Sequence, residues 1–325
     1  MVTLNSIFRS DMIMQANKPV RFFGNGRGQV KITFNGTEKE AISNGKWLIE
    51  FEPVSYGGPY DIDIFLDGCY TLIKNVYFGD VYLLGGQSNM QFKLKESSEC
   101  AANYKGNENV YLYTVDRMEK GEQFYSVDGW VKLTKDNARD FSAIGYYVGQ
   151  GLATSDRKIG LIACYQGASV IQSWMSKDVA LAPEFYVKDR FIDHEWFPIW
   201  NDDGVLYEHM IEKILPFSLN SVLWYQGESN ASNNEADIYL NLLEALIKSW
   251  RRDFKDENLR FIVIQLADHL DRQGYAWETI QKAQLLASEK IPLTDCVICR
   301  DVCDNIDIHP REKDVLSNRI VKLLK

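Results

Sequence analysis

The first 76 residues alternate apolar and polar side chains, which is the pattern of β-strands that bury one face. Val30–Phe34 and Thr37–Ile42 flank Asn35-Gly36, a pair that accepts the positive φ of a hairpin turn. The same turn signal recurs at Asn44-Gly45. Further alternating strands are expected at Lys46–Phe51, Tyr60–Leu66 and Cys69–Ile73. The pattern predicts a small antiparallel β-sandwich domain over residues 1–77.

From residue 78 to residue 325 the pattern changes to apolar runs that alternate with helical segments. The predicted strands are Val81–Leu84, Ile159–Cys164, Ser221–Tyr225, Leu259–Leu266 and Asp295–Cys299. The predicted helices, with apolar residues three and four apart, are Ala143–Ser155, Ile238–Trp250, Trp277–Lys290 and Glu312–Leu324. This alternation is typical of an α/β domain, a parallel sheet flanked by helices on both faces.

Composition narrows the class of protein. Hydrophobic residues make up 46% and charged residues 25% of the 325 positions, as in globular proteins. The net charge of -9 and the lack of a dense basic run argue against nucleic acid as a partner. The sequence has no apolar stretch long enough to span a membrane. The first residues lack a secretory-signal pattern, so we expect a cytoplasmic protein, or a secreted or periplasmic one if a leader has been removed.

Cysteines do not point to a metal or a disulfide scaffold. Six cysteines in this length are too few for a disulfide framework. Cys296, Cys299 and Cys303 are close together, but a zinc site needs a fourth ligand at a recognisable spacing. We expect no metal and no cofactor.

Three glycine turns follow predicted parallel strands, and each carries polar side chains. They are Gly85–Met90, Tyr165–Ser169 and Gln226–Ala231. Ligands of open parallel sheets bind beyond the carboxyl ends of the strands, so these turns are candidates for one site. Ser88 in the first turn is a candidate nucleophile, because Gly85-Gly86 permits a tight strand-to-helix turn that exposes the hydroxyl. The alternative is that Ser88 only caps a helix.

A serine nucleophile needs a base, and histidine is the usual one. Among the four histidines, His309 follows the last strand and stands before Pro310, which suits the first position of a helix. We predict His309 as the base, with His269 as the alternative. Asp307 is two residues earlier and is the candidate that orients His309; Asp304, Asp301 or no carboxylate are the alternatives.

Acyl transfer also needs hydrogen-bond donors for the oxyanion. The candidates are the backbone N–H groups of Ser88 and Gly167 and the side-chain amide of Asn230 or Gln226. We assign substrate binding to Gln87, Glu228 and Trp174. Aromatic rings can stack on sugar rings, so Trp174, Trp196 and Trp200 are candidates for this contact. Core packing is the alternative for each.

Four strings in this order resemble the sialate O-acetylesterase family of SGNH hydrolases. They are Gly86-Gln-Ser-Asn-Met90, Tyr165-Gln-Gly167, Trp224-Tyr-Gln-Gly-Glu-Ser-Asn230 and Asp307-Ile-His-Pro310. The resemblance implies a flavodoxin-like hydrolase domain that removes O-acetyl groups from sugars, with Ser88 as nucleophile and His309 as base. It also implies Ser88, Gly167 and Asn230 as oxyanion donors. The family commonly has the acid three residues before the histidine, where this chain has Ile306, so a Ser–His dyad is an alternative to a triad with Asp307.

These observations predict a metal-free serine esterase that acts on an O-acetylated sugar, most simply O-acetylated sialic acid. Acetylxylan or another acetylated polysaccharide is the alternative substrate. A catalytically inert carbohydrate-binding protein is the alternative of a different class. The sequence leaves the oligomeric state open.

Overall fold

The structure is a computed structural model of the chain, and it describes all residues except 99–100, 119–128, 188–189, 191–199, 233 and 303–305. The strands are β1 (Thr3–Leu4), β2 (Ile13–Gln15), β3 (Val20–Phe34), β4 (Thr37–Phe51), β5 (Gly57–Leu66), β6 (Cys69–Gly86), β7 (Asn107–Thr114), β8 (Val131–Leu133), β9 (Ile159–Tyr165), β10 (Ser221–Tyr225), β11 (Arg260–Ile264) and β12 (Thr294–Val297). The α-helices are α1 (Ser88–Gln91), α2 (Lys135–Ala138), α3 (Ala143–Leu152), α4 (Lys177–Ala180), α5 (Tyr239–Asp253), α6 (Tyr275–Lys290) and α7 (Lys313–Leu324).

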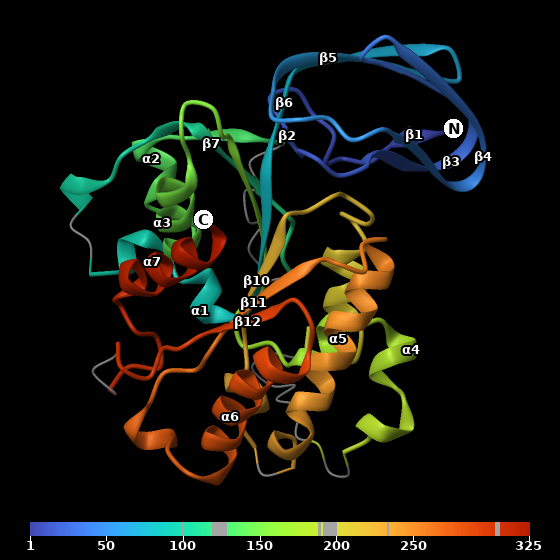
Figure 1. Cartoon of the computed structure of the whole chain (residues 1–325). Coiled ribbons are helices and arrows are strands. Elements are labelled where there is room, and N and C mark those ends of the chain that lie inside the picture. Colours follow the sequence, from blue (N-terminus) through green and yellow to red (C-terminus); the bar gives the residue numbers. More distant parts are fainter. Residues whose placement is uncertain (99–100, 119–128, 188–189, 191–199, 233, 303–305) are drawn as a thin grey trace.

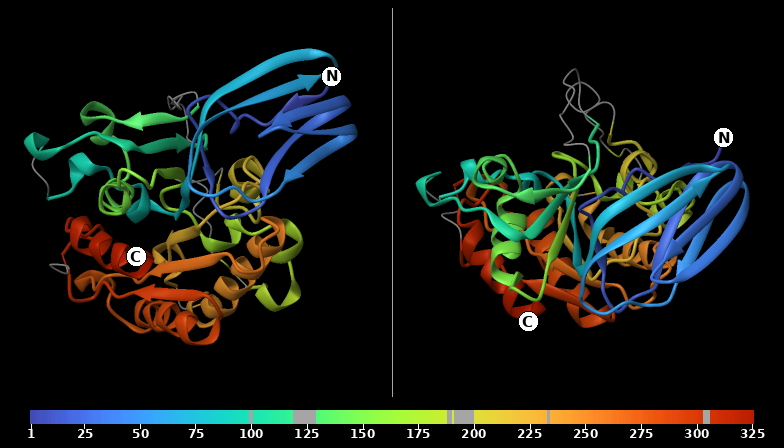
Figure 2. Two further views of the ribbon diagram at one scale, coloured as in Figure 1. Left: turned by 45° about the horizontal axis from the view of Figure 1, so that its top comes forward. Right: turned by 90° about the horizontal axis from the view of Figure 1, so that it is seen from above.

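The N-terminal strands form a curved antiparallel sheet (Figure 1 and Figure 2). β3 and β4 pair over their whole length around Asn35-Gly36, and both turn residues have the predicted positive φ. β3 also pairs with β1 and β5, and β5 pairs with the first half of β6. Because these ladders make one connected sheet, a sandwich of two separate sheets is not confirmed.

The turn predicted at Asn44-Gly45 is wrong. Both residues lie inside β4, opposite Arg27 and Gly26 of β3. The turn at Asn35-Gly36 sets the register of the hairpin, and that register places Asn44-Gly45 within a ladder that continues to Phe51. The backbone groups of the pair are therefore used in strand pairing, and the local turn preference is overridden.

Aromatic rings fill the hollow of the N-terminal sheet. Phe34 lies among Phe22, Phe51, Tyr60 and Phe78, with ring centroids 5.7 to 6.4 Å from its own. The edge-to-face geometry of most of these pairs is the favoured one for aromatic packing. Phe78 belongs to β6, so this cluster reaches the strand that continues into the second half of the chain.

The second half is built on a parallel sheet with the order β7-β9-β6-β10-β11-β12. α3 and α7 lie together on one side of this sheet, and α5 and α6 lie on the other (Figure 1). The five predicted strands and four predicted helices are confirmed, and the ends of all but one differ by three residues or fewer. The exception is Val81–Leu84, which is the last part of one long strand, β6, together with the separately predicted strand Cys69–Ile73. β7 and β8 were not predicted, because the apolar run Val110–Tyr113 in β7 is short and β8 has only three residues.

The topology creates one place for a ligand. The chain leaves β6, passes through α3 to β9 on one side of β6, and later returns to β10 on its other side. Where the strand order reverses in this way, a crevice lies beyond the carboxyl ends of the strands. The residues that follow Gly86, Tyr165 and Tyr225 are therefore brought to the same edge of the sheet.

A buried carboxylate joins the two halves of the chain. Asp80, at the point where β6 enters the parallel sheet, is fully buried and forms an ion pair with Arg157. It also accepts hydrogen bonds from Gln15 Nε2 at 3.2 Å, Tyr56 OH at 3.1 Å and Asn220 Nδ2 at 2.9 Å. Gln15 and Tyr56 belong to the N-terminal half, whereas Arg157 and Asn220 precede β9 and β10. Donors from both halves thus satisfy one anion.

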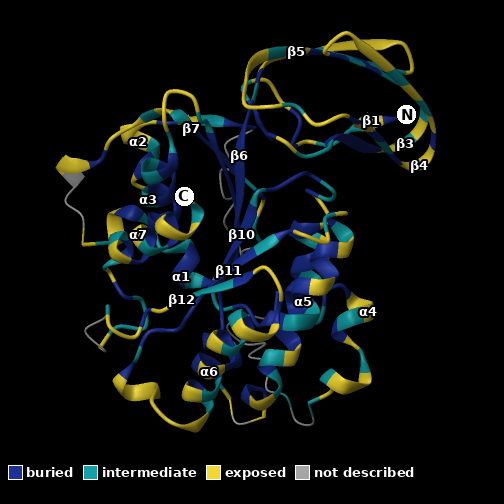
Figure 3. Cartoon of the chain, viewed as in Figure 1, coloured by how far each residue is buried: buried dark blue, intermediate teal, exposed yellow. Residues whose placement is uncertain are grey.

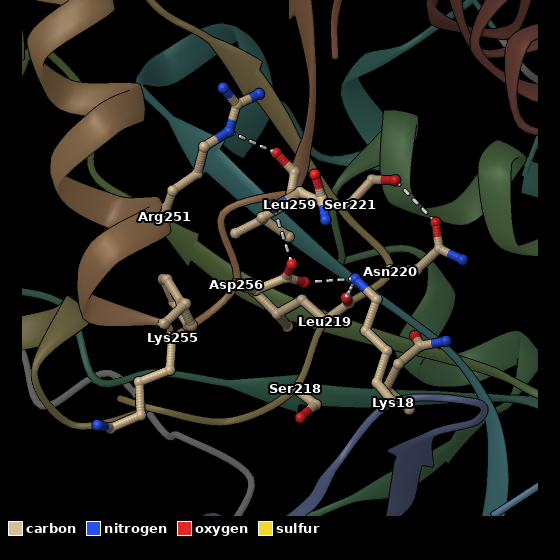
Figure 4. A network of polar contacts seen from close by, with 12 residues as sticks. Lys18, Ser218, Leu219, Asn220, Ser221, Arg251, Lys255, Asp256 and Leu259 are labelled. Atoms are coloured by element: carbon tan, nitrogen blue, oxygen red, sulfur yellow. Dashed lines mark hydrogen bonds and ion pairs between the residues drawn. The ribbon is translucent and has the colours of Figure 1, made fainter. Parts of the chain in front are cut away.

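A second polar contact between the halves involves Lys18 (Figure 4). Its Nζ donates to the carbonyl oxygen of Leu219 at 2.7 Å and to Asp256 Oδ2 at 2.6 Å. Leu259 N–H donates to the backbone carbonyl of Asp256, and Arg251 Nε donates to the carbonyl oxygen of Leu259 at 2.9 Å. The segment before β3 is therefore bound to the loops before β10 and β11.

The core of the second half lies along the parallel sheet. Every residue of β9 and β10 is buried, while the outer faces of the helices are exposed (Figure 3). Continuous apolar runs such as these are expected where helices cover both faces of a sheet. Among the described residues, no helix combines the length and the apolarity needed to cross a bilayer.

The Asp80 junction predicts a loss of stability on mutation. In Asp80→Ala, Gln15, Asn220 and Arg157 would keep buried or half-buried donors without an acceptor, so we expect the free energy of unfolding to fall by about 3 kcal/mol. Urea unfolding followed by circular dichroism measures this change. Tyr56→Phe is the control, since it removes one exposed donor and should cost less than about 1 kcal/mol. Equal effects of the two substitutions would contradict the prediction.

Candidate active site

Ser88 is the first residue of α1 and follows β6 across a tight turn. Gly86 has a φ of +121°, and a Cβ at this position would lie 2.1 Å from the carbonyl oxygen of Tyr225, so the turn requires glycine. The turn places Ser88 Oγ 2.8 Å from His309 Nε2. The structure thus brings the predicted nucleophile and the predicted base into hydrogen-bond contact, although they are 221 positions apart.

His309 lies in a half-buried position beside Phe92. The two rings are stacked, with centroids 5.9 Å apart and an angle of 23° between them. Burial, followed by the positive charge of Lys313, lowers the pKa of His309, while the carboxylates of Asp307 and Glu96 oppose this shift. The imidazole is therefore held neutral near pH 7, which is the state that accepts a proton.

Asp307 contacts His309 mainly through the backbone. The His309 N–H donates to Asp307 Oδ1 at 2.8 Å, whereas His309 Nδ1 lies 3.6 Å from the same oxygen, too far for a hydrogen bond. Of the alternative carboxylates, Asp301 forms a two-pronged ion pair with Arg319 at 2.8 Å. Asp304 lies outside the described residues. An orienting role for Asp307 stays a prediction.

The alternative base, His269, occupies a different environment. It is buried next to Trp277, with ring centroids 6.3 Å apart, and its Nδ1 has no hydrogen-bond partner among the described residues. The contact with Ser88 Oγ belongs to His309. The geometry therefore favours His309 over His269 as the partner of Ser88.

Gly167 lies beside Ser88 at the end of β9. A Cβ on Gly167 would be 3.8 Å from Ser88 Cβ, and the Gly167 N–H donates to Gln91 Oε1 at 2.8 Å. Gln91, one turn after Ser88 in α1, was not predicted from sequence, and no motif marks it. Its amide oxygen shows that the Gly167 N–H can reach an oxygen placed close to Ser88.

The two amides predicted as oxyanion donors lie in a buried network. Asn230 Nδ2 donates to Gln172 Oε1 at 2.9 Å and to Glu235 Oε1 at 3.3 Å. Gln226 Nε2 donates to Asn230 Oδ1 at 2.7 Å and to the carbonyl oxygen of Ser169 at 3.0 Å. Both side chains are fully buried. An oxyanion role for Asn230 or Gln226 stays a prediction that would require these bonds to break.

Gln87 and Glu228 lie under the Ser88 turn and are only 3% and 4% exposed. With its amide nitrogen turned toward Glu228, Gln87 donates to Glu228 Oε2 at 3.0 Å. Asn89 Nδ2 donates to Glu228 Oε1 at 2.6 Å. Burial raises the pKa of Glu228, and the hydrogen bond from Asn89 opposes that shift. The hydrogen bonds of Gln87 and Glu228 stabilise the turn that carries Ser88. Because both side chains are buried, the structure does not support direct contact of either one with a sugar.

Trp174 is also fully buried. Its Nε1 donates to Ser169 Oγ at 2.9 Å, and its ring packs edge-to-face on Trp224 with centroids 5.9 Å apart. Trp200 is buried as well, and Trp196 lies outside the described residues. The place of Trp174 matches the alternative of core packing, because it presents no free ring face to a sugar.

Sequence reasoning missed Lys313 and Asn89. Lys313 Nζ donates to Asn89 Oδ1 at 2.5 Å, and Asn89 Nδ2 donates to the carbonyl oxygen of Ile308 at 2.9 Å. A signal existed for Lys313: it is three and seven positions before Leu316 and Ile320, which puts a charge on the apolar face of α7. Nothing in the local sequence distinguishes Asn89 from an exposed polar residue.

A metal centre is not indicated by the described part of the chain. It contains no group of three or more His, Cys, Asp or Glu side chains that could hold an ion. Cys164 and Cys296 are free thiols, and Cys303 lies outside the described residues.

Comparison with known families identifies the chemistry. The family model for carbohydrate esterases of the sialic acid-specific acetylesterase type matches residues 78–313. The chain belongs to this family. It is therefore a carboxylic ester hydrolase that acts on acetylated carbohydrate. The predicted resemblance to the sialate O-acetylesterase family is confirmed.

Relatives of this esterase match nearly the whole chain. The human sialate O-acetylesterase is 27% identical over 97% of this chain and 69% of the human protein. The rat sialate O-acetylesterase is 27% identical over 90% of this chain and 65% of the rat protein. Among solved structures, a carbohydrate acetylesterase from Xanthomonas citri is 25% identical, with a TM-score of 0.83 over 99% of this chain and 74% of that chain. The similarity thus includes the N-terminal strands.

The environment of His309 predicts its titration. Burial and the charge of Lys313 lower the pKa of His309. The midpoint of its titration should therefore lie below the ordinary value of 6.5. Histidine-labelled protein followed by NMR as the pH is lowered measures this value, with His309→Gln to assign the signal. A titration at or above 6.5 would contradict the burial of the ring and the electrostatic effect of Lys313 on it.

Proposed function

We propose that this esterase removes O-acetyl groups from an acidic sugar, O-acetylated sialic acid, with Ser88 as nucleophile and His309 as general base. The observation that carries the proposal is the 2.8 Å contact between Ser88 Oγ and His309 Nε2 at the carboxyl ends of β6, β9 and β10. A hydroxyl hydrogen-bonded to a neutral imidazole is an activated nucleophile.

The reaction proceeds in two halves. Ser88 Oγ attacks the acetyl carbonyl carbon while His309 Nε2 takes the hydroxyl proton, and the tetrahedral intermediate collapses as the sugar oxygen leaves with that proton. Water then attacks the acetyl-Ser88 ester and gives a proton to His309. Collapse of the second intermediate releases acetic acid, which ionises, and restores Ser88 and His309. No metal or cofactor takes part in these steps.

The oxyanion is stabilised by backbone donors. The first N–H groups of a helix have no acceptor within the helix, and Ser88 stands at this position of α1. The Gly167 N–H already donates to an amide oxygen, that of Gln91, which is half-buried and can give way to the acetyl oxygen of the substrate. We propose that Ser88 and Gly167 supply these two donors.

We assign the orientation of His309 to its backbone contact with Asp307 together with packing on Phe92. The distance of 3.6 Å between Asp307 Oδ1 and His309 Nδ1 supports a weaker orienter than a triad carboxylate. The site therefore resembles the Ser–His dyad more than a full triad.

The strand order supports assignment of residues 78–325 to the flavodoxin-like SGNH hydrolase fold. The order reverses at β6 and the site lies beyond that reversal, as the fold requires. For residues 1–77, the aromatic cluster around Phe34 supports a separate small β domain of sandwich type. β6 (Cys69–Gly86) begins in the proposed N-terminal domain and ends in the proposed hydrolase domain.

Substitution of the nucleophile tests the proposal. Ser88→Ala removes the attacking oxygen, so we expect kcat/KM for p-nitrophenyl acetate to fall at least about 10⁴-fold with the fold intact. Ester hydrolysis followed by absorbance and folding followed by circular dichroism give the two readouts. Ser229→Ala, in the neighbouring turn after β10, is the matched control and should keep wild-type activity. Comparable turnover by Ser88→Ala would exclude Ser88 as nucleophile.

An exposed arginine favours an acidic sugar. Arg272 lines a surface pocket of about 260 Å³ together with Ala231 and Tyr275, and it has no ion-pair partner among the described residues. Burial and Lys313 lower the pKa of His309 most, and the positive charge of Arg272 adds a smaller contribution in the same direction. A carboxylate on the substrate is the group that an unpaired guanidinium binds best.

We therefore expect Arg272→Gln to lower kcat/KM for O-acetylated sialic acid by about 10- to 100-fold, the value of a charge-assisted hydrogen bond. Acetate release from this sugar, from acetylxylan and from p-nitrophenyl acetate measures the effect, and the two uncharged esters should lose much less. Arg252→Gln on α5 is the control arginine. Two results together would favour a polysaccharide acetylesterase. The wild type would hydrolyse acetylxylan better than O-acetylated sialic acid, and Arg272→Gln would not lose activity selectively on the acidic sugar.

A further inference from the structure

Lys313 is a fully buried lysine at the start of α7. Its ammonium donates a hydrogen bond to Asn89 Oδ1 at 2.5 Å. It also lies 5.0 Å from the ring centroid of Phe92 and 5.1 Å from that of Tyr225. The described residues provide no carboxylate within ion-pair distance. Burial of an ammonium without a paired anion opposes folding, so this charge needs an explanation other than stability.

The contacts of Asn89 link Lys313 to the base. Asn89 follows Ser88 in α1, and its Nδ2 donates to the carbonyl oxygen of Ile308, the residue before His309. The contact of Ser88 with His309 and the contact of Asn89 with Ile308 therefore join the same two segments, one position apart. Together they fix the His309 segment relative to the Ser88 turn.

The orientation of the Asn89 amide depends on the charge of Lys313. Asn89 Nδ2 faces two acceptors, the carbonyl oxygen of Ile308 and Oε1 of Glu228, while Asn89 Oδ1 faces the ammonium. With the amide reversed, its oxygen would face both acceptors and its NH₂ group would face the ammonium. A cation at this position holds the amide in the orientation that binds Ile308.

Phe92 provides a second connection. Its ring contacts the Lys313 ammonium, and the same ring is stacked on the His309 imidazole. A cation near an aromatic ring stabilises the placement of that ring. Lys313 therefore acts on the His309 backbone through Asn89 and on the His309 ring through Phe92, without touching substrate.

We propose that Lys313 is a positioning residue of this active site, whose charge holds His309 in line with Ser88 through Asn89 and Phe92. This inference rests on the roles proposed above for Ser88 and His309. It extends them, because it makes a buried charge outside the dyad a condition for turnover.

The surrounding charges give the proposal a pH signature. Burial lowers the pKa of Lys313 to about 8, while Cys299, Glu228, Asp307 and Glu312 oppose the shift. Lys313 in turn adds to burial in lowering the pKa of His309, which Asp307 and Glu96 raise and Arg272 lowers. As the pH rises through about 8, Lys313 loses its proton and the hold on Asn89 weakens. We expect kcat to fall in that range.

The first test replaces the charge. Lys313→Met keeps length and removes the ammonium, and we expect kcat for p-nitrophenyl acetate to fall about 10²-fold with little change in KM, as misplacement of a reacting group does. The fall of kcat above pH 8 should disappear in this variant. Lys313→Arg keeps a charge that does not titrate, so it should lose the alkaline fall and retain more activity than Lys313→Met. Lys322→Met, an exposed lysine of the same helix, is the matched control.

A second variant tests the connection itself and covers a failure of Lys313→Met to fold. Asn89→Ala should also lower kcat, and the double variant should lose little more than Lys313→Met alone, because the contact with Asn89 is one of the two routes by which Lys313 acts. Independent and additive losses would overturn the role of Asn89 as the link.

An NMR readout separates this inference from the proposed function. Removal of the positive charge in Lys313→Met should raise the pKa of His309 relative to the wild type, whether or not the ester is hydrolysed. Hydrolysis that survives in Ser88→Ala would reject the proposed function, while the His309 titration would still test Lys313. A folded Lys313→Met protein with an unchanged His309 pKa and an unchanged pH profile would reduce Lys313 to a structural residue, whatever its kcat.

Discussion

The strand β6 is the constraint on which the rest of the molecule depends. Its first half pairs antiparallel with β5, and its second half pairs parallel with β9 and β10. One strand thus belongs to both the N-terminal sheet and the parallel sheet. The strand ends at Gly86, where the close approach of Tyr225 admits only glycine, and Ser88 follows at the edge of the sheet where the turns after β9 and β10 also lie.

Around the Ser88 turn the structure keeps several polar side chains out of water. Gln226, Asn230 and Glu235 are hydrogen-bonded in one group, and Asn89 links Glu228 to Lys313 in another. Buried polar groups are tolerated when each finds a partner, and a fully connected network is rigid. This rigidity holds Ser88 and His309 at hydrogen-bond distance before any substrate arrives, which is the preorganisation that acyl transfer needs.

The sequence was informative where local chemistry and topology agree. The apolar runs gave the parallel strands, and the glycine turns after them pointed to Ser88 and Gly167, because carboxyl ends of parallel strands converge. His309 could be predicted from Pro310 and the final helix. Asn44-Gly45 was misread because the register of a long hairpin overrides a local turn signal. Trp174, Asn230 and Gln226 were placed near the substrate since their strings are close to the site, whereas their burial depends on contacts with distant residues such as Trp224 and Glu235.

The junction at Asp80 limits how freely the N-terminal sheet can be exchanged for another one. All the groups assigned to chemistry lie after residue 78, yet the anion that anchors β6 accepts hydrogen bonds from Gln15 and Tyr56 in the N-terminal half. A hydrolase half recombined with a foreign N-terminal sheet would retain a buried carboxylate with part of its donors missing. Exchange of the N-terminal strands would therefore require new donors for Asp80 in the places of Gln15 and Tyr56.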